Sequence, residues 1–201
     1  MQLVLASGSP RRRELLALIT EDFTVCPVDA DETLRPGAPL ADEVVRLSVL
    51  KAQAAQRIHP DAVCIGSDTM VTIDGLPLGK PADGKQAADM LRRLRGRTHE
   101  VLTGLAVLPP GGAARTRCTR TRVTFRDFEE DELAAYLATG EPLDKAGAYG
   151  IQGRGALLIE GISGDYYSVM GLPVAGLHVM LRQLAREMRA GSAVPIDGKE
   201  Y

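Results

Sequence analysis

A short segment near the N-terminus combines groups that suit phosphate binding. Residues 7–13 read Ser-Gly-Ser-Pro-Arg-Arg-Arg and follow an apolar run that predicts a strand. Ser9 is of a type favoured at a helix N-cap and Pro10 of a type favoured at the first helical position, so a helix is expected to begin here. Its free N–H groups and positive dipole end, with serine hydroxyls and arginines beside them, would bind phosphate. The alternative is an ordinary capped helix with solvated arginines. The GxxxxGK[ST] pattern of a Walker A loop is absent.

Acidic residues occur where two further strands are expected to end. Asp29, Asp31 and Glu32 follow the second predicted strand, and Asp68 interrupts an apolar run after the third. Carboxylates at strand ends can bind a hard divalent cation, and one of them can deprotonate a water molecule. A carboxylate beside a buried strand is costly unless it is paired or functional, which favours a functional role for Asp68. Glu32 has the alternative of a solvated position in an acidic loop.

Two lysines and a glutamine could complete such a site. Lys51 lies within a long amphipathic helix, and Lys80 is fixed between a glycine and a proline. Cations there would neutralise the charge of a triphosphate, although most lysines are simply surface residues. Gln152 could read the edge of a base, because its amide both donates and accepts hydrogen bonds. His99 is expected to be a packed strand residue rather than a catalyst.

Alternating strands and helices must position these groups. Periodicity and turn signals predict strands at 2–6, 23–28, 62–65, 70–73, 100–108 and 116–128, and helices at 10–19, 40–58, 83–94, 129–138 and 172–189. This alternation indicates an α/β fold, in which ligands bind where strands lead into helices. We expect one domain over residues 1–189 and a flexible tail at 190–201.

The composition argues against several other classes of protein. The chain has 201 residues, of which 45% are apolar, and a formal net charge of −2 from 24 Lys+Arg and 26 Asp+Glu. This balance gives no general attraction to nucleic acid or to an anionic membrane. Three widely spaced cysteines, with no signal-peptide pattern and no membrane-length apolar run, predict a cytoplasmic protein. The alternating arginines are expected on the outer face of an edge strand, with RNA binding as the alternative; they are Arg115, Arg117, Arg120 and Arg122.

Taken together, these motifs resemble the Maf family of nucleoside triphosphate pyrophosphatases, over nearly the whole chain up to about residue 189. The resemblance rests on ASGSPRR at 6–12, DE at 31–32, KA at 51–52, GSDT at 66–69, GKP at 79–81, His99 with Thr103-Gly104, DKAGAYGIQG at 144–153 and GLP at 171–173. It implies an α/β fold like that of the inosine-triphosphate pyrophosphatases, a twisted mixed sheet flanked by helices with a cleft between two lobes. It also implies a divalent cation, Mg²⁺ or Mn²⁺, and commonly a homodimer.

The same resemblance assigns roles to individual residues. It implies that Asp68 is the catalytic carboxylate and that Glu32 joins it in binding the metal. It places the phosphate contacts on Ser7, Arg12, Lys51 and Lys80. Members that act on dTTP and UTP carry characteristic residues at three specificity positions, which here are Arg11, Thr69 and Gln152. A sister branch that acts on 7-methyl-GTP has other residues at those positions.

The expected function is therefore hydrolysis of dTTP and UTP to the monophosphate and pyrophosphate, with modified pyrimidine triphosphates as further candidate substrates. The expected role in the cell is removal of surplus or modified pyrimidine nucleotides before polymerases use them. Two alternatives stay open beside RNA binding. One is a nucleotide-sensing module that restrains cell division through a partner, and the other is a pyrophosphatase for 7-methyl-GTP.

Overall fold

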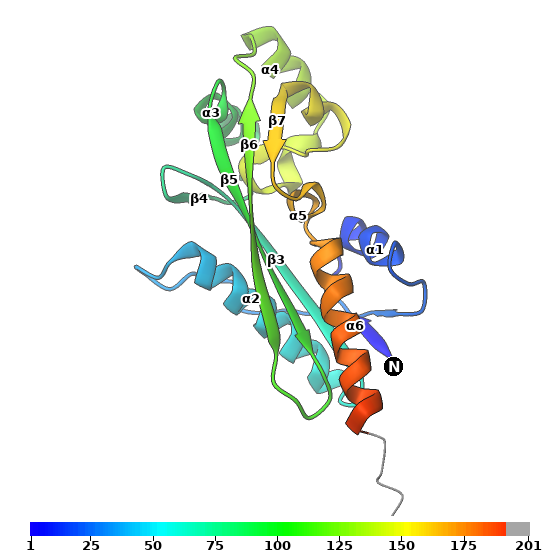
Figure 1. Cartoon of the computed structure of the whole chain (residues 1–201). Helices are drawn as coiled ribbons and strands as arrows, with labels where there is room; N and C mark the ends of the chain where they lie inside the picture. The colour runs from blue at the N-terminus through cyan, green and yellow to red at the C-terminus, as the bar shows by residue number, and fades with distance from the viewer. Residues whose placement is uncertain (192–201) are drawn as a thin grey trace, which may run out of the picture.

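Three long strands form the centre of the molecule. The computed structural model describes residues 1–191 and shows an elongated shape (Figure 1). Strands β3 (Val63–Ile73), β5 (Thr98–Leu108) and β6 (Arg115–Phe125) run side by side from one end toward the other. The expected α/β fold, a mixed sheet flanked by helices, is confirmed.

Within residues 1–191, seven strands form one sheet in the order β2-β1-β3-β5-β6-β7, with β4 paired to β3. β1 (Leu3–Leu5) runs parallel to β2 (Thr24–Val25) and to β3. β4 (Leu76–Leu78) and β7 (Ile159–Ser163) are antiparallel to their neighbours. β1 pairs only as far as Leu5 with Ile65, so the chain leaves the sheet beside the middle of β3. This geometry brings the 7–13 segment next to the centre of the sheet.

Helices cover both faces of the sheet. α2 (Leu40–Ile58) lies on one face, and α1 (Pro10–Ala17), α5 (Tyr166–Met170) and α6 (Val174–Gly191) lie on the other (Figure 1). The alternation of side chains along β3 agrees with this layering: Cys64 belongs to the cluster with α2, whereas Ile65 belongs to the cluster with α1 and α6. The far end carries α3 (Gly84–Leu94), α4 (Glu130–Leu137) and the 3₁₀ helices η1 (Glu141–Asp144), η2 (Ala146–Ala148) and η3 (Gly153–Leu158).

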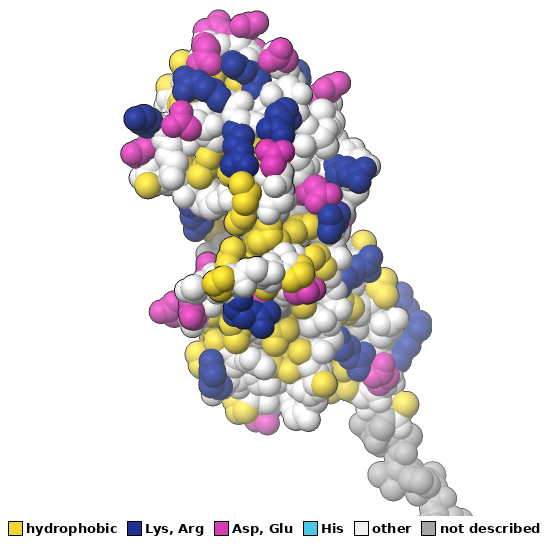
Figure 2. All heavy atoms as spheres, turned by 90° about the vertical axis from the view of Figure 1, so that its left-hand side faces the viewer, with side chains coloured by type: hydrophobic (Ala, Val, Ile, Leu, Met, Phe, Trp, Pro, Cys, Tyr) yellow, Lys and Arg dark blue, Asp and Glu magenta, His cyan; other side chains and the backbone are white. Residues whose placement is uncertain are grey.

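The buried side chains form separate clusters at the two ends of the sheet. One cluster joins α3 and α4 to the far end of β3, around Val71, Leu91 and Leu133. The other clusters join the near end of the sheet to α1, α2 and α6. The molecule accordingly has two lobes, and Figure 2 shows it narrowing between them. The two lobes agree with the two-lobed form that the resemblance implied.

β3 differs from the prediction in one important respect. Two short segments around Gly66–Thr69 were expected, but β3 is one strand of 11 residues. β5 pairs with it without interruption from Cys64 to Thr72, so the polar residues in the middle keep their ladder hydrogen bonds. Asp68 and Thr69 therefore lie within a strand, and the expectation that Asp68 follows the end of a strand is wrong.

Two glycines allow α2 to lie directly on the sheet. A Cβ at Gly66 would stand 2.0 Å from the carbonyl oxygen of Ser48, and one at Gly104 would stand 2.2 Å from that of Val44. Both carbonyls belong to the backbone of α2, which cannot yield as a flexible side chain would. The close contact sets the distance between α2 and β3, and with it the position of Lys51.

The C-terminal third contains more regular structure than expected. The glycine-rich stretch 147–171 forms η2, η3, β7 and α5. α6 begins at Val174 and continues to Gly191, so residues 190 and 191 of the predicted tail are helical. The rest of that predicted tail, 192–201, lies outside the described residues. Within residues 1–191 no helix is both long enough and apolar enough to cross a membrane.

Only part of β6 is an edge strand. β7 pairs with β6 from Arg122 to Phe125, which leaves the portion before it at the edge. The prediction of an edge position is confirmed for Arg115, Arg117 and Arg120 but is wrong for Arg122, which pairs with Ser163 of β7. Three of these arginines are in ion pairs: Arg115 with Glu187, and both Arg120 and Arg122 with Glu100.

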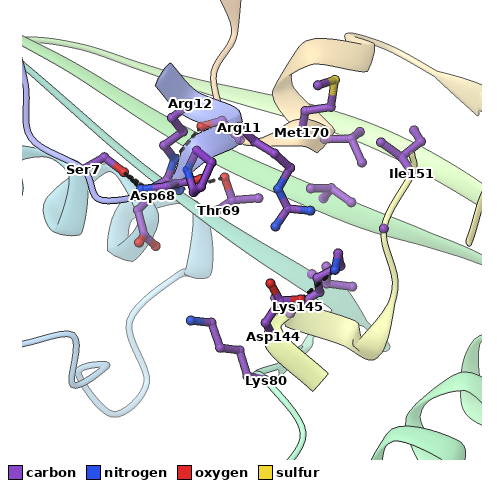
Figure 3. Close-up of a pocket in the computed structure, with 18 of the residues that line it drawn as sticks. Ser7, Arg11, Arg12, Asp68, Thr69, Lys80, Asp144, Lys145, Ile151 and Met170 are labelled. Carbon is purple, nitrogen blue, oxygen red and sulfur yellow. Dashed lines mark hydrogen bonds and ion pairs between the residues drawn. The ribbon is translucent and has the colours of Figure 1, made fainter. Parts of the chain in front are cut away.

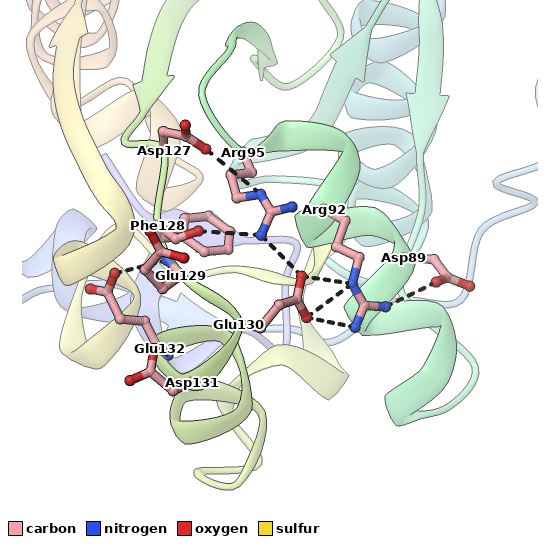
Figure 4. A network of polar contacts seen from close by, with 9 residues as sticks. All are labelled: Asp89, Arg92, Arg95, Asp127, Phe128, Glu129, Glu130, Asp131 and Glu132. Carbon is pink, nitrogen blue, oxygen red and sulfur yellow. Dashed lines mark hydrogen bonds and ion pairs between the residues drawn. The ribbon is translucent and has the colours of Figure 1, made fainter.

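A second polar network joins α3 to α4 at the end of the far lobe. Glu130 accepts hydrogen bonds from Arg92 and Arg95, at 2.8 and 3.0 Å (Figure 4). Arg95 also lies over the ring of Phe128. These contacts hold the far lobe together without touching the space between the lobes.

We predict that Gly104→Ala destabilises the fold by about 1–3 kcal/mol or more, because the added methyl group meets helix backbone. Urea unfolding measures the difference in the free energy of unfolding. Gly84→Ala is the matched control, since a Cβ there would meet no atom within 4 Å. Equal stability of the Gly104→Ala and Gly84→Ala proteins would show that α2 does not depend on this close approach.

Candidate active site

A cleft of about 790 Å³ opens between the two lobes, above the middle of β3. Every residue to which the resemblance gave a role lines it: Ser7, Arg11, Arg12, Glu32, Lys51, Asp68, Thr69, Lys80 and Gln152. Asp29 and Asp31, which the sequence also offered as carboxylates for a cation, do not line it. Figure 3 shows the side chains of Arg11 and Lys80 extending into the open space from opposite sides. Residues far apart in the sequence thus meet at one place.

Two carboxylates converge on one ammonium group. Lys51 Nζ lies 2.6 Å from Asp68 Oδ1 and 2.7 Å from Glu32 Oε1. Lys51 and Asp68 are both buried, while the side chain of Glu32 is 62% exposed. A buried lysine needs a partner of opposite charge, and here it has two. The contacts connect three separate elements: α2, β3 and the loop that carries Glu32.

The segment 7–13 presents hydroxyl and guanidinium groups to the same place. Ser7 Oγ accepts hydrogen bonds from the backbone N–H of Ser9, at 3.2 Å, and from Arg12 Nη1, at 3.4 Å. The hydroxyl proton of Ser7 is therefore available to a phosphate oxygen. Ser9 is the N-cap residue, but its side chain makes no capping hydrogen bond, contrary to its expected role. The N–H groups of the first turn of α1 stay available to an anion.

Arg12 is held firmly in the wall of the cleft. Its Nε donates to the carbonyl oxygen of Gly171 at 2.9 Å, and its Nη2 lies 3.5 Å from Thr69 Oγ1. Burial lowers the pKa of Arg12 from its ordinary value, against the charges of Asp68 and Glu32, which raise it. A guanidinium stays protonated under such conditions. Arg12 thus offers a fixed positive charge beside Asp68.

The loop that carries Glu32 is anchored from below by Glu43. The fully buried carboxylate of Glu43 accepts from the backbone N–H of Arg35 at 2.9 Å and from Arg46 Nη2 at 2.7 Å. Arg46 in turn donates to the carbonyl oxygen of Thr33 at 2.8 Å. Hydrogen bonds from Arg46 and from the backbone of Arg35 lower the pKa of Glu43 to about 2. Glu32 is therefore placed by groups that hold the backbone next to it.

The donor set of the cleft fits a hard divalent cation that also binds phosphate. Asp68 and Glu32 both contact Lys51 Nζ, so their carboxylates lie close together, and carboxylate oxygen is the ligand type that Mg²⁺ and Mn²⁺ prefer. Within residues 1–191 no group of three or more His, Cys, Asp or Glu side chains is arranged to hold a metal ion. An ion held by these two carboxylates would need phosphate oxygens and water as further ligands. Mg²⁺ in nucleotide enzymes is bound in this way.

The cations near Glu32 affect its ionisation. Burial raises the pKa of Glu32, but the hydrogen bond and charge of Lys51, with the charges of Lys80 and Arg12, outweigh burial and lower it overall. Glu32 is thus a carboxylate at neutral pH, as metal binding requires.

The far wall of the cleft holds a charged pair without an assigned role. Lys145 Nζ donates at 2.6 Å to both Asp144 Oδ1 and the carbonyl oxygen of Glu141. The hydrogen bond from Lys145 lowers the pKa of Asp144, and the charge of Arg11 lowers it further. Arg11 thus faces Asp144 across the cleft (Figure 3). Asp144 and Lys145 both belong to the motif at 144–153 that carries the resemblance, but the resemblance gave neither of them a function.

His99 is a packed residue, as expected. It is 2% exposed, and its Nε2 lies 2.7 Å from the hydroxyl oxygen of Tyr149, whose ring contacts it edge-on. Burial lowers the pKa of His99 to about 4, so the imidazole is neutral at neutral pH. Tyr149 lines the cleft, and His99 supports it from behind.

Sequence reasoning missed the residues that support the site from outside it. Glu43 reads as a surface residue in the first turn of a helix, yet it is fully buried. Its spacing of three from Arg46 on one helix was a usable signal, because residues at i and i+3 are neighbours. Thr103 belongs to a motif of the resemblance, but its role was not predicted. Its hydroxyl bonds to Ser168, which is far away in the sequence, so no spacing of neighbouring residues indicates the contact.

The family model and the sequence relatives agree on one family. A family model described as Maf-like protein matches residues 2–184. A dTTP/UTP pyrophosphatase of Moorella thermoacetica is 51% identical over 181 residues, covering 90% of this chain and 93% of that protein. One of Bacillus velezensis is 49% identical over 174 residues, covering 87% of this chain and 92% of that protein. Among solved structures, the Staphylococcus aureus Ham1 protein matches with a TM-score of 0.47 and 16% identity, over 63% of this chain and 73% of that chain.

The family model covers nearly all of the chain that forms the two lobes, and the relatives match over almost their full length. The resemblance seen in the motifs is thereby confirmed. The chain belongs to the Maf family.

Proposed function

We propose that this protein hydrolyses dTTP and UTP to the nucleoside monophosphate and pyrophosphate. The observation that carries the proposal is the cluster of Asp68, Lys51 and Glu32 in the cleft, next to Ser7 and Arg12. Such a cluster suits a metal-bound triphosphate better than any other ligand class considered for this chain. The relatives named dTTP/UTP pyrophosphatase support the choice of nucleotide.

The triphosphate would lie along the cationic side of the cleft. Ser7, Arg12 and Lys80 would contact its oxygens, and Lys51 would compensate the charges of the two carboxylates. Asp68 and Glu32 would hold Mg²⁺ or Mn²⁺. When bound, this ion would neutralise charge on the phosphate oxygens. The protein's own part is to fix these groups in place before the substrate arrives.

Asp68 would position the attacking water and accept its proton. The water oxygen forms a bond to the α-phosphorus while the bond from that phosphorus to the bridging oxygen breaks. The bridging oxygen leaves with pyrophosphate, whose developing charge Arg12 and Lys80 would stabilise. Asp68 suits this role because β3 and Lys51 fix its carboxylate on a rigid strand.

The base would lie at the end of the cleft formed by Arg11, Thr69 and Gln152. The amide of Gln152 can donate a hydrogen bond to a carbonyl of uracil or thymine. Apolar side chains, among them Ile151 and Met170, line the same region and suit the flat faces of a base (Figure 3). The homodimer and the cytoplasmic location expected from the sequence stay predictions, as does the absence of nucleic-acid binding.

A panel of nucleotides, scored for pyrophosphate release with and without Mg²⁺, tests the proposal. We expect metal-dependent release from UTP and dTTP, weaker release from CTP and little from purine triphosphates. Tight nucleotide binding without turnover would instead favour the sensing module. Preference for 7-methyl-GTP would place the protein in the sister branch.

We predict that Asp68→Asn keeps the fold and lowers kcat by about 10²–10⁴, the range expected when a positioned general base is removed. Stopped assays of pyrophosphate measure kcat, and thermal unfolding checks the fold. Near-normal turnover in a folded Asp68→Asn protein would remove Asp68 from the mechanism.

We predict that Lys80→Ala impairs triphosphate hydrolysis by about 1.5–3 kcal/mol, the scale of a hydrogen bond to a charged group. Inhibition by the monophosphate product should change less, because the monophosphate lacks the β- and γ-phosphates. Lys85→Ala is the matched control, since Lys85 lies on α3 and does not line the cleft. Equal losses of affinity for triphosphate and monophosphate would place Lys80 away from the leaving pyrophosphate.

We predict that Gln152→Glu loses the preference for uracil and thymine, because a carboxylate cannot donate to a base carbonyl. The measurement is kcat/KM for UTP, dTTP, CTP, GTP and 7-methyl-GTP on both proteins. An unchanged ranking of the five substrates would show that Gln152 does not read the base, even if pyrophosphate release itself is confirmed.

A further inference from the structure

A row of buried hydroxyl groups crosses the sheet where the two lobes meet. Thr103 on β5, Thr121 on β6 and Ser168 on α5 are all fully buried. Thr69 on β3, which lines the cleft, stands at the end of this row. Thr69 Oγ1 lies 3.2 Å from Thr103 Oγ1, directly across the paired strands. Thr69, which lines the cleft, is therefore in contact with Thr103, which does not line it.

The direction of the hydrogen bond between the two threonines follows from their partners. Thr103 Oγ1 donates to the carbonyl oxygen of Ser168 at 2.7 Å, and a carbonyl can only accept. A hydroxyl has one proton, so Thr103 has none left to donate to Thr69. The contact between the hydroxyls must then use the proton of Thr69. Thr69 donates to Thr103 and presents only lone pairs to its other neighbours.

The surroundings of Thr69 agree with this direction. Arg12 Nη2 lies 3.5 Å from Thr69 Oγ1, and a guanidinium can only donate. One lone pair of Thr69 thus faces Arg12, and a second is available toward the cleft. A group of the ligand that faces Thr69 must donate a hydrogen bond, because an acceptor there would meet an oxygen with no proton to share.

We propose that Thr103 is a positioning residue that makes Thr69 an obligate hydrogen-bond acceptor, so that the site selects bases carrying an N–H at N3. This inference rests on the proposed function, in which Thr69 contacts the base. Uracil and thymine carry a proton on N3, whereas N3 of cytosine is an acceptor. With N3–H directed to Thr69, the amide of Gln152 remains free to donate to a neighbouring carbonyl. Discrimination against cytosine then comes from a residue that never touches the substrate.

Thr103→Val tests the proposal, because it removes the hydroxyl and keeps the shape. Thr69 then loses its acceptor and can turn its proton toward the cleft, where it can donate to N3 of cytosine. We expect kcat/KM for CTP to rise and the ratio of kcat/KM for UTP to that for CTP to fall about tenfold, the scale of one unmatched hydrogen bond. Thr103→Ser keeps the hydroxyl and should restore the ratio. A rise for CTP is not what damaged packing would produce.

Thr121→Val is the matched control. Thr121 is an equally buried threonine on the adjacent strand. Its hydroxyl lies 2.9 Å from Ser168 Oγ and 3.2 Å from the carbonyl oxygen of Asp165, not beside Thr69. It should leave the ratio of UTP to CTP unchanged. An equal fall in Thr121→Val and Thr103→Val would overturn the proposal, because the effect would then follow from loosening α5.

A binding measurement keeps the test independent of catalysis. The α,β-imido analogues of dUTP and dCTP cannot be cleaved at the α–β position and report affinity alone. The wild-type protein should bind the dUTP analogue more tightly, and Thr103→Val should narrow the gap. Equal affinities in the wild type, or an unchanged gap in a folded Thr103→Val protein, would overturn the role of Thr103. Absence of pyrophosphate release from UTP by the wild type would instead contradict the proposed function.

Discussion

The ammonium group of Lys51, held between the carboxylates of Asp68 and Glu32, is the interaction on which the site depends. A lysine buried in a helix that packs on a sheet is costly unless opposite charge compensates it. Here the compensating charges come from β3 and from the loop before α2, so one cation ties three elements together. The same arrangement leaves two carboxylates close together with cations nearby, which is the environment that a metal-bound triphosphate needs. The contacts of Lys51 with Asp68 and Glu32 therefore both stabilise the fold and prepare the cleft for its ligand.

The rest of the fold can be understood as what keeps this cluster in place. Gly66 and Gly104 bring α2 close enough for Lys51 to reach Asp68. Glu43 and Arg46 hold the backbone of the loop that carries Glu32, at Arg35 and Thr33. β3 carries Asp68 at its centre and passes into both lobes, so the cluster is rigid while the walls of the cleft belong to separate hydrophobic cores. Arg11 and Asp144 face each other from these two walls, which is where a bound nucleotide would bridge them (Figure 3).

Much of this architecture could be predicted from the sequence where the signal was local. The strong apolar periodicity of residues 40–58 predicted α2 with the bounds it has. The sequence pattern predicted a break at Gly66–Thr69, where β3 is continuous, because glycine and polar residues within a strand have the same composition as a turn. β5 supplies that partner from more than thirty residues away along the chain, as the pairing of Asp68 with Gly104 shows. The contacts of Thr103 with Ser168 and of Glu43 with Arg35 were equally out of reach, since neither follows from spacing on one element alone. Residue types and positions singled out the 7–13 segment, Glu32, Asp68, Lys51, Lys80 and Gln152, and the resemblance to a family added Thr69 and the individual roles. The structure brings all of these residues that were given roles to one cleft.

Hydrolysis of UTP in water enriched in ¹⁸O tests most directly the claim that Asp68 directs water to the α-phosphorus. Mass spectrometry of the products locates the bond that water forms, whatever the rate of the reaction. The account predicts that the heavy oxygen appears in UMP and that the pyrophosphate released carries none. Label in the pyrophosphate, or release of UDP and inorganic phosphate, would place the attack on another phosphorus and contradict this assignment of the cleft.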